Sequence, residues 1–270
     1  MLFLTGLRPR PRDIKDDAGF PLSLPLIRDL DAISFTTPVT FLVGENGSGK
    51  STLLEGIAAG IGAVAVGGHD LSRDPSLEAA RRFAASFYFS RRRHARTRLF
   101  LRAEDVFGFT SRVTADMAGL EQDRSDLADN LPEGYGRLIA TGAVAAQRGA
   151  LVASYGQDPD SRSHGETFLA LLRRRVVPNG LYLLDEPETP LSPSRVLAMM
   201  AFMAERVKQG CQFIIATHSP ILMAFPGATI LLAENGTLAE AAWTDIEHVR
   251  VTRAFLADPK AALAKLLDKG

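Results

Sequence analysis

Hydrophobic residues follow two kinds of pattern along this chain. Short, unbroken apolar runs predict buried strands at Val39–Val43, Leu181–Leu184 and Phe213–Ala216. Apolar residues at helical spacing follow the first run directly, and similar patterns predict helices over 165–175 and 193–208. Because buried strands alternate with helices, we predict an α/β core built on a mostly parallel sheet.

Weaker patterns precede and interrupt this core. Prolines and short apolar runs in residues 1–38, among them 22–24 and 33–35, predict short strands and turns. Residues 84–90 and 97–103 have the composition of two strands, and an arginine-rich segment separates them. This arrangement predicts a β-hairpin.

The C-terminal third carries a stronger turn signal. Asn235-Gly236 lies between two apolar stretches, 229–233 and 238–242, and Asn-Gly in this setting predicts a hairpin. The tail from Asp245 onward has a helical pattern.

Composition changes near Glu104, where apolar runs give way to a mixed segment with an acidic patch. We therefore predict one domain in three parts. They are an N-terminal β part with the phosphate loop described below (1–104), an inserted helical subdomain (105–175), and the rest of the core with a C-terminal helix (176–270).

Overall composition is that of a soluble globular protein, with 46% hydrophobic and 23% charged residues and a net charge of zero. The single Cys211 excludes an internal disulfide and fits a reducing compartment. No apolar run has membrane-spanning length and the start does not have the charge order of a secretory signal, so we expect a cytoplasmic protein without an integral membrane segment.

A local concentration of arginines could bind nucleic acid or could be an ordinary solvated surface; it comprises Arg81, Arg82, Arg91, Arg92, Arg93, Arg96, Arg98 and Arg102.

The sequence GENGSGKST, which follows the first predicted strand, carries the clearest chemistry. It matches the phosphate-binding loop pattern G-x-x-x-x-G-K-[ST] between a strand and a helix. Glycines let successive backbone N–H groups converge on phosphate oxygens. Lys50 would neutralise the outer phosphates and the Ser51 hydroxyl would ligate Mg²⁺. The predicted nucleotide-binding residues are Gly44, Glu45, Asn46, Gly47, Ser48, Gly49, Lys50, Ser51 and Thr52.

Two carboxylates end the second predicted strand. Asp185 is placed to hold Mg²⁺ through water, and Glu186 is the natural residue to orient or deprotonate an attacking water. Asp-Glu-Pro would also suit a simple turn, but the phosphate loop favours the functional interpretation.

Together, GENGSGKST, LYLLDEPE and ATHSP resemble the motifs of the ATP-binding-cassette (ABC) ATPase superfamily in order and spacing. SHGETFLALL and QFIIATHSPIL further resemble a soluble bacterial AAA-like subgroup related to the SMC and DNA-repair cassettes. The resemblance extends from about residue 20 to the C-terminal helix. It implies a P-loop NTPase of ABC type with an N-terminal antiparallel β part, an inserted helical subdomain, ATP and Mg²⁺ as ligands, and ATP hydrolysis.

Further site residues follow only from this resemblance. Ser163 and Gly165 stand where the family has its LSGGQ signature, which reaches the γ-phosphate bound by a second copy and implies a head-to-tail homodimer around ATP. His164 and Glu166 depart from the signature, and Ser163 with Glu166 would also suit an ordinary helix cap. His218 matches the switch histidine that contacts the γ-phosphate and the attacking water.

Two family features are altered here. Ser192 occupies the place of an Asp in the loop that follows the carboxylates, so the usual contact of that Asp across the dimer is in doubt. Where the family has the Gln of its Q-loop, Glu104 follows the predicted strand and could bind the metal or pair with an arginine instead.

Three functions fit these observations. The first is a soluble Mg-dependent ATPase whose dimerisation moves a protein partner or nucleic acid. The second is the ATP-binding subunit of a transporter with separate membrane chains, and the third is a slow ATP-gated binding protein. Retention of Lys50, Glu186 and His218 favours an enzyme over the third.

Overall fold

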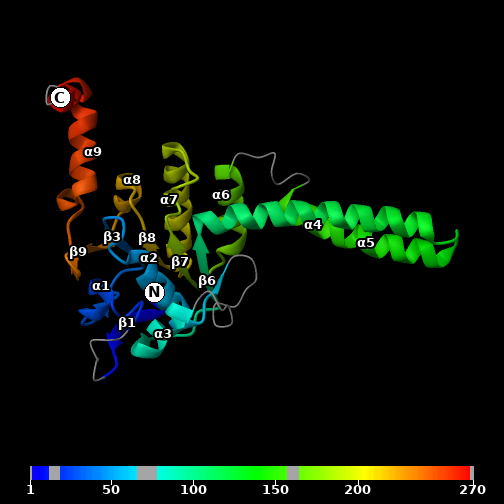
Figure 1. Cartoon of the computed structure of the whole chain (residues 1–270), viewed down its shortest axis with the longest axis horizontal. Coiled ribbons are helices and arrows are strands. Elements are labelled where there is room, and N and C mark those ends of the chain that lie inside the picture. The colour runs from blue at the N-terminus through cyan, green and yellow to red at the C-terminus, as the bar shows by residue number, and fades with distance from the viewer. Residues whose placement is uncertain (1, 12–18, 66–77, 157–163, 268–270) are drawn as a thin grey trace. The chain divides into compact units, whose positions relative to one another are not determined.

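The computed structural model describes residues 2–11, 19–65, 78–156 and 164–267. Internal contacts divide the chain into two compact units, Met1–Ala103 with Arg175–Gly270, and Glu104–Arg174. Among the described residues, the strands all belong to the first unit and the second consists of helices; Figure 1 shows their elements in chain order.

A seven-stranded sheet forms the centre of the first unit. Its strand order is β10-β9-β3-β8-β7-β6-β4, and every neighbouring pair is parallel except β10 with β9. The strands are β3 (Val39–Gly44), β4 (Val64–Ala65), β6 (Thr97–Arg102), β7 (Gly180–Asp185), β8 (Gln212–Ala216), β9 (Thr229–Glu234) and β10 (Thr237–Glu240). Strands β3, β7 and β8 are buried along their whole length, as their unbroken apolar runs predict. The α/β fold with a mostly parallel sheet is therefore confirmed, and so is the Asn235-Gly236 hairpin between β9 and β10.

A second, antiparallel sheet has the order β2-β1-β5 and consists of β1 (Leu4–Pro9), β2 (Ile33–Ser34) and β5 (Phe87–Arg91). It is the antiparallel N-terminal part that the family resemblance implies. The hairpin predicted over 84–103 is wrong, because β5 pairs with β1 whereas β6 lies parallel to β7 in the large sheet. The physical reason is burial: Leu99, Phe100 and Leu101 of β6 are all buried, which suits a central strand, whereas β5 has exposed positions.

Two neighbouring predictions also need correction. Residues 84–86 end helix α3 (Glu78–Ser86) instead of opening a strand. Residues 22–24 lead into helix α1 (Pro25–Arg28), where Pro25 occupies the first turn and favours a helix start over a strand.

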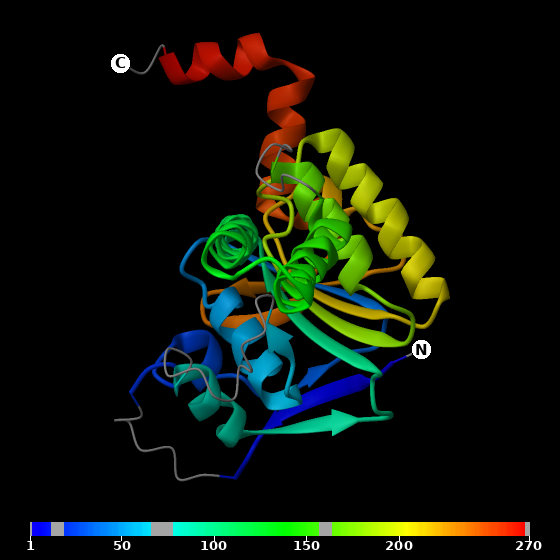
Figure 2. The same ribbon diagram turned by 90° about the vertical axis from the view of Figure 1, so that its right-hand side faces the viewer.

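Helix α2 (Lys50–Ile61) connects the two sheets through the hydrophobic core. Its buried residues Leu53, Leu54 and Ile57 belong to one cluster with side chains of both sheets, among them Leu7 and Ile214. Helix α7 (Pro193–Lys208) covers the opposite face of the large sheet (Figure 2). The other described helices of this unit are α8 (Pro220–Met223), η2 (Trp243–Asp245), α9 (Glu247–Ala257) and α10 (Pro259–Leu267).

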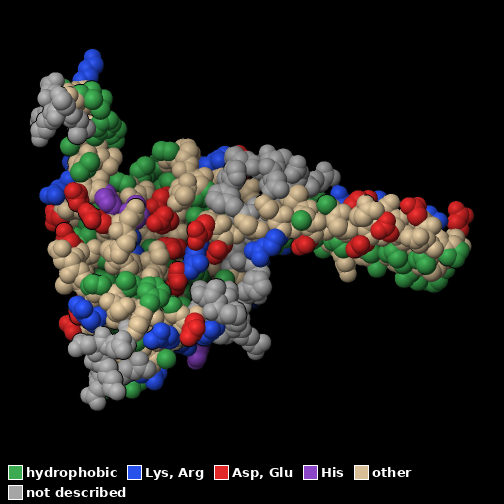
Figure 3. Space-filling view, in the orientation of Figure 1, with side chains coloured by type: hydrophobic (Ala, Val, Ile, Leu, Met, Phe, Trp, Pro, Cys, Tyr) green, Lys and Arg blue, Asp and Glu red, His purple; other side chains and the backbone are tan. Residues whose placement is uncertain are grey.

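The helical unit contains α4 (Ala103–Asn130), α5 (Tyr135–Tyr155) and most of α6 (His164–Arg175). Helices α4 and α5 form an antiparallel hairpin in which Arg148 Nε lies 3.2 Å from Glu121 Oε2. Hydrophobic side chains gather along α5 near the loop to α4 (Figure 3), where Tyr135, Leu138 and Ile139 are exposed. Among the described residues, no helix has the length and apolar character needed to cross a membrane.

Several of the clustered arginines are engaged within the protein. Arg91 and Arg98 donate to the carbonyl oxygens of Gly60 and Ile61, at the C-terminal end of α2. Arg102 forms an ion pair with Glu55 on α2. Three of the eight arginines thus contact α2, two of them at its C-terminal carbonyl oxygens, where a positive charge is favourable.

Candidate functional site

The phosphate-binding loop connects the end of β3 to the start of α2. Gly44 has a φ of 152°, and a Cβ there would lie 2.4 Å from the carbonyl oxygen of Ala233. Gly49 caps α2 in a left-handed conformation, with a φ of 93°. Both positions require glycine, and the loop they form directs backbone N–H groups from the first turn of α2 outward.

Lys50 opens α2 and its side chain turns back over the loop. Its Nζ donates to the Glu45 carbonyl oxygen at 2.7 Å and lies 3.4 Å from Ser48 Oγ. Lys50 is 4% exposed, and burial lowers the pKa of its ammonium while Glu186 and Asp185 act in the opposite direction. An anion at this loop would replace the carbonyl as the partner of Lys50.

Asp185 ends β7 beside the phosphate loop. Its Oδ1 accepts a hydrogen bond from Ser51 Oγ at 3.1 Å. Burial raises the pKa of Asp185 to about 6, against the opposing effects of the Ser51 hydroxyl and of Arg102. Ser51 and Asp185 thus bring a hydroxyl and a carboxylate together, the oxygen ligands that Mg²⁺ prefers.

The described residues contain no group of three or more His, Cys, Asp or Glu side chains arranged to hold a metal. Mg²⁺ at a phosphate loop keeps several waters and binds phosphate oxygens in addition to one or two protein ligands. Ser51 and Asp185 therefore fit a Mg²⁺ that binds together with a nucleotide.

Glu186 and His218 meet at the ends of adjacent strands. His218 follows β8, which lies between β3 and β7 in the sheet, so the loop, the histidine and the carboxylates occupy three neighbouring strand ends. His218 Nε2 lies 3.6 Å from Glu186 Oε1. Burial lowers the pKa of His218, and nearby Lys50 and His248 lower it further while Glu186 raises it. His218 is therefore biased toward the neutral form beside a carboxylate.

Glu188 is a site residue that the sequence placed in a loop without assigning it a role. Its Oε1 accepts hydrogen bonds from Thr217 Oγ1 at 2.6 Å, from His218 N at 2.8 Å and from Ser219 N at 3.1 Å. The second Glu of LYLLDEPE was the only signal that could have indicated it.

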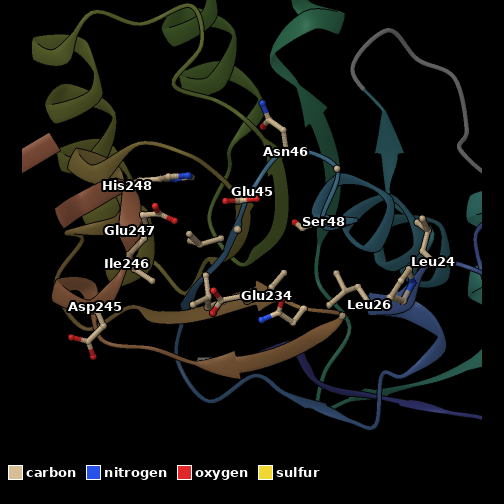
Figure 4. Close-up of a pocket in the computed structure, with 18 of the residues that line it drawn as sticks. Leu24, Leu26, Glu45, Asn46, Ser48, Glu234, Asp245, Ile246, Glu247 and His248 are labelled. Atoms are coloured by element: carbon tan, nitrogen blue, oxygen red, sulfur yellow. The ribbon is translucent and has the colours of Figure 1, made fainter. Parts of the chain in front are cut away.

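A cavity of about 580 Å³ lies beside the first half of the phosphate loop (Figure 4). Leu24 and Leu26 lie on one side of it, whereas Glu247 and His248 lie on the other. Sequence reasoning missed this cavity because its walls come from four separate segments. Glu45 and Ser48, which contact Lys50, line the cavity, whereas Lys50 itself does not, so the cavity adjoins the proposed phosphate site.

The remaining predicted site residues belong elsewhere. Gly165 is buried in the first turn of α6, and Glu104 is exposed at the start of α4; both are part of the helical unit. Ser163 lies outside the described residues. Ser192 precedes α7, and its Oγ lies 3.1 Å from Ser194 Oγ.

The parallel sheet with its phosphate loop, and the carboxylates at the neighbouring strand end, define the class of protein as a P-loop NTPase. Comparison with known families agrees. A model described as "AAA domain" matches residues 22–110, and one described as "AAA domain, putative AbiEii toxin, Type IV TA system" matches residues 167–224.

The chain is also similar to individual ATP-binding proteins. The chain is 28% identical over 224 residues to a hemin import ATP-binding protein of Nocardia farcinica, covering 80% of this chain and 70% of the relative. It is 28% identical over 206 residues to a cytochrome c biogenesis ATP-binding export protein of Paramagnetospirillum magneticum, covering 74% and 82% of the two chains. A solved ATP-binding cassette of an ABC transporter in its ADP conformation aligns over 98% of this chain and 99% of its own, with 17% identity and a TM-score of 0.47.

These comparisons support the ABC ATPase superfamily, and the chain is an ATP-hydrolysing P-loop NTPase. The resemblance predicted from the three motifs is thereby confirmed at the level of the superfamily.

Proposed function

We propose that this protein is a Mg-dependent ABC-type ATPase that dimerises around ATP and thereby drives a conformational change in a partner. One observation carries the proposal. Lys50, the Ser51–Asp185 pair at 3.1 Å and the Glu186–His218 pair at 3.6 Å converge at three adjacent strand ends. This set supplies a phosphate cation, metal ligands and a base for water.

Each side chain has a role that follows from its chemistry. Lys50 neutralises the outer phosphates, and Ser51 and Asp185 hold Mg²⁺, which supplies charge neutralisation for the phosphates when bound. Glu186 orients or deprotonates the attacking water, and His218 hydrogen-bonds the γ-phosphate. Glu104 remains a candidate for contact with the metal or its water.

The nucleoside has a fitting site beside these groups. The 580 Å³ cavity adjoins Gly44 to Ser48, and Leu24 and Leu26 offer it an apolar wall. The other walls are largely polar, with Asn46, Glu234 and Glu247 among their residues. A concave site of this size with both apolar and polar walls can take a small molecule. We infer that the base and ribose occupy the cavity while the phosphates lie against Lys50.

Dimerisation would complete the site. Ser163 and Gly165 of a second copy would contact the γ-phosphate, so that each copy completes the other's pocket. The α4–α5 hairpin supports transmission to a partner, because helices of 28 and 21 residues are about 42 and 32 Å long at 1.5 Å per residue. The partner would be nucleic acid or another protein, and comparing ATPase rates with and without DNA separates these two.

Glu186→Gln tests the proposal. The variant should bind ATP, hydrolyse it about 100-fold more slowly or worse, and form a dimer in Mg-ATP that solution sizing detects. Glu205→Gln is the matched control, because it makes the same change at an exposed position on α7, outside the phosphate loop and the strand ends of the site. A Glu186→Gln protein that stays monomeric at saturating Mg-ATP would contradict the dimer, and one that hydrolyses ATP normally would contradict the role of Glu186.

A second candidate is the ATP-binding subunit of a transporter with separate membrane chains. The names of the two relatives, one an import and one an export ATP-binding protein, favour it. Purification of the Glu186→Gln protein with Mg-ATP from detergent-solubilised cells distinguishes the two: an integral membrane protein bound in stoichiometric amount would support the transporter subunit and contradict the first proposal.

A further inference from the structure

One buried carboxylate connects the two loops that carry Glu186 and His218. Glu188 lies two residues beyond Glu186, and its Oε1 accepts three hydrogen bonds from consecutive residues, Thr217, His218 and Ser219. Two of the donors are backbone N–H groups, so the carboxylate fixes the backbone of His218 itself.

The two loops also have backbone hydrogen bonds. Glu186 has a φ of 46°, a left-handed conformation that is unfavourable for a residue with a side chain. Its N–H donates to the Ala216 carbonyl oxygen at 2.9 Å, which is the backbone link between the two strand ends. Ser219 N also approaches Thr217 Oγ1 at 3.0 Å, and the Ser219 side chain then caps α8 by accepting from Leu222 N. The Glu188 carboxylate thus adds three hydrogen bonds between the loops.

The length of the Glu188 side chain matters more than its charge for these three hydrogen bonds. A single oxygen accepts all three hydrogen bonds, whereas Oε2 is buried and has no hydrogen-bond partner within the described part of the chain. Burial also raises the pKa of Glu188. A glutamine at this position would keep an acceptor oxygen at the same distance from the backbone, whereas an aspartate would keep the charge but be shorter by about 1.5 Å, one carbon–carbon bond.

We propose that Glu188 is a positioning residue for hydrolysis, which holds the His218 loop against the Glu186 loop so that both side chains face the same phosphate. The proposal rests on the proposed role of His218. Loss of the link would let the imidazole move relative to the carboxylate, now 3.6 Å away, and small misplacements of catalytic groups are costly to the rate.

Four variants test this in steady-state ATPase assays and in equilibrium ATP binding. Glu188→Ala and Glu188→Asp should lower kcat about tenfold or more, with a Kd for ATP within about threefold of the wild type. Glu188→Gln should retain most of the wild-type kcat. Glu205→Ala, at the exposed carboxylate on α7, is the control for a general effect of losing a glutamate and should match the wild type. Thermal unfolding of each variant shows whether it is folded.

The ranking of the variants by kcat tests the proposal. The proposal is overturned if Glu188→Asp is more active than Glu188→Gln, because charge would then matter more than reach, or if folded Glu188→Ala has a kcat within about twofold of the wild type. His218→Ala separates this failure from failure of the proposed function. If His218→Ala has a low kcat and Glu188→Ala a wild-type kcat, only the positioning role is contradicted. If His218→Ala has a wild-type kcat, the assigned role of the histidine is contradicted.

Discussion

Asp185 should make the nucleotide-free protein less stable at neutral pH than it would be with a neutral residue. Its carboxylate is 8% exposed, and burial raises its pKa from an ordinary 3.8 to about 6. Asp185→Asn removes the charge and keeps an oxygen that can accept the hydrogen bond from Ser51. We therefore expect the asparagine variant to be more stable than the wild type without nucleotide.

The magnitude follows from the pKa. A folded-state pKa near 6, against 3.8 in the unfolded chain, means that the folded protein binds the proton more tightly. At pH above 6 this difference costs the folded wild type about 3 kcal/mol, since each tenfold change in a binding constant is worth about 1.4 kcal/mol. The cost disappears as the pH falls through 6 toward 4, because Asp185 is then protonated in the folded state.

Chemical denaturation between pH 5 and 8, which spans the folded-state pKa of about 6, measures this difference. Asp185→Asn should exceed the wild type in free energy of unfolding by up to about 3 kcal/mol at pH 8, and the advantage should shrink toward pH 5. Asp123→Asn, at an exposed position on α4, is the control and should leave the pH dependence unchanged. The same Asp185→Asn protein should lose the stabilisation that Mg-ATP gives the wild type.

Two results would refute this reasoning. If Asp185→Asn is no more stable than the wild type at pH 8, then the carboxylate carries no burial cost. If it is more stable by the same amount at pH 5 and pH 8, the gain does not come from ionisation.

Three further predictions concern single side chains. Lys50→Ala should weaken ATP binding about tenfold or more in calorimetry, because it removes the buried cation of the loop, and unchanged binding would contradict the assigned role. Gln212→Leu should lower the free energy of unfolding by about 3 kcal/mol in denaturant titrations. Buried Gln212 accepts hydrogen bonds from Phe3 N and Leu4 N and donates one to Leu4 O, which connects the two sheets. A loss of less than about 1 kcal/mol would contradict this role. Tyr182→Phe should cost about 2 kcal/mol in denaturant titrations, because its hydroxyl pairs with both Val177 N and Val177 O, and a neutral result would contradict this.

The sequence predicted those parts of the site that depend on local order. A phosphate loop needs glycines and a lysine in sequence between a strand and a helix, so GENGSGKST defined it directly. Asp185 and Glu186 were predictable because a fully apolar strand ends at them. The predicted bounds 193–208 for α7 match the structure, with Gly210 just beyond it at a φ of 83°.

The missed features depend on contacts between distant segments. Strand β5 has an ordinary alternating pattern, and only its pairing with β1 shows that it leaves β6 for a different sheet. The role of Glu188 requires knowing that its loop faces residues 217–219, about thirty positions away. The length of α4 and α5 was also missed, since the sequence indicated only a segment that is helical in places.

The point at which the helical unit enters the chain has a consequence for engineering. Strands β6 and β7 are hydrogen-bonded neighbours, with Thr97 beside Gly180 and Arg102 beside Asp185, although the whole of Glu104–Arg174 separates them in sequence. A parallel pair needs only one crossover helix, and α6 can serve as that helix. The α4–α5 hairpin is therefore an insertion whose length can change while the pairing of β6 with β7 is kept. A designed helical hairpin could be inserted at the same junction.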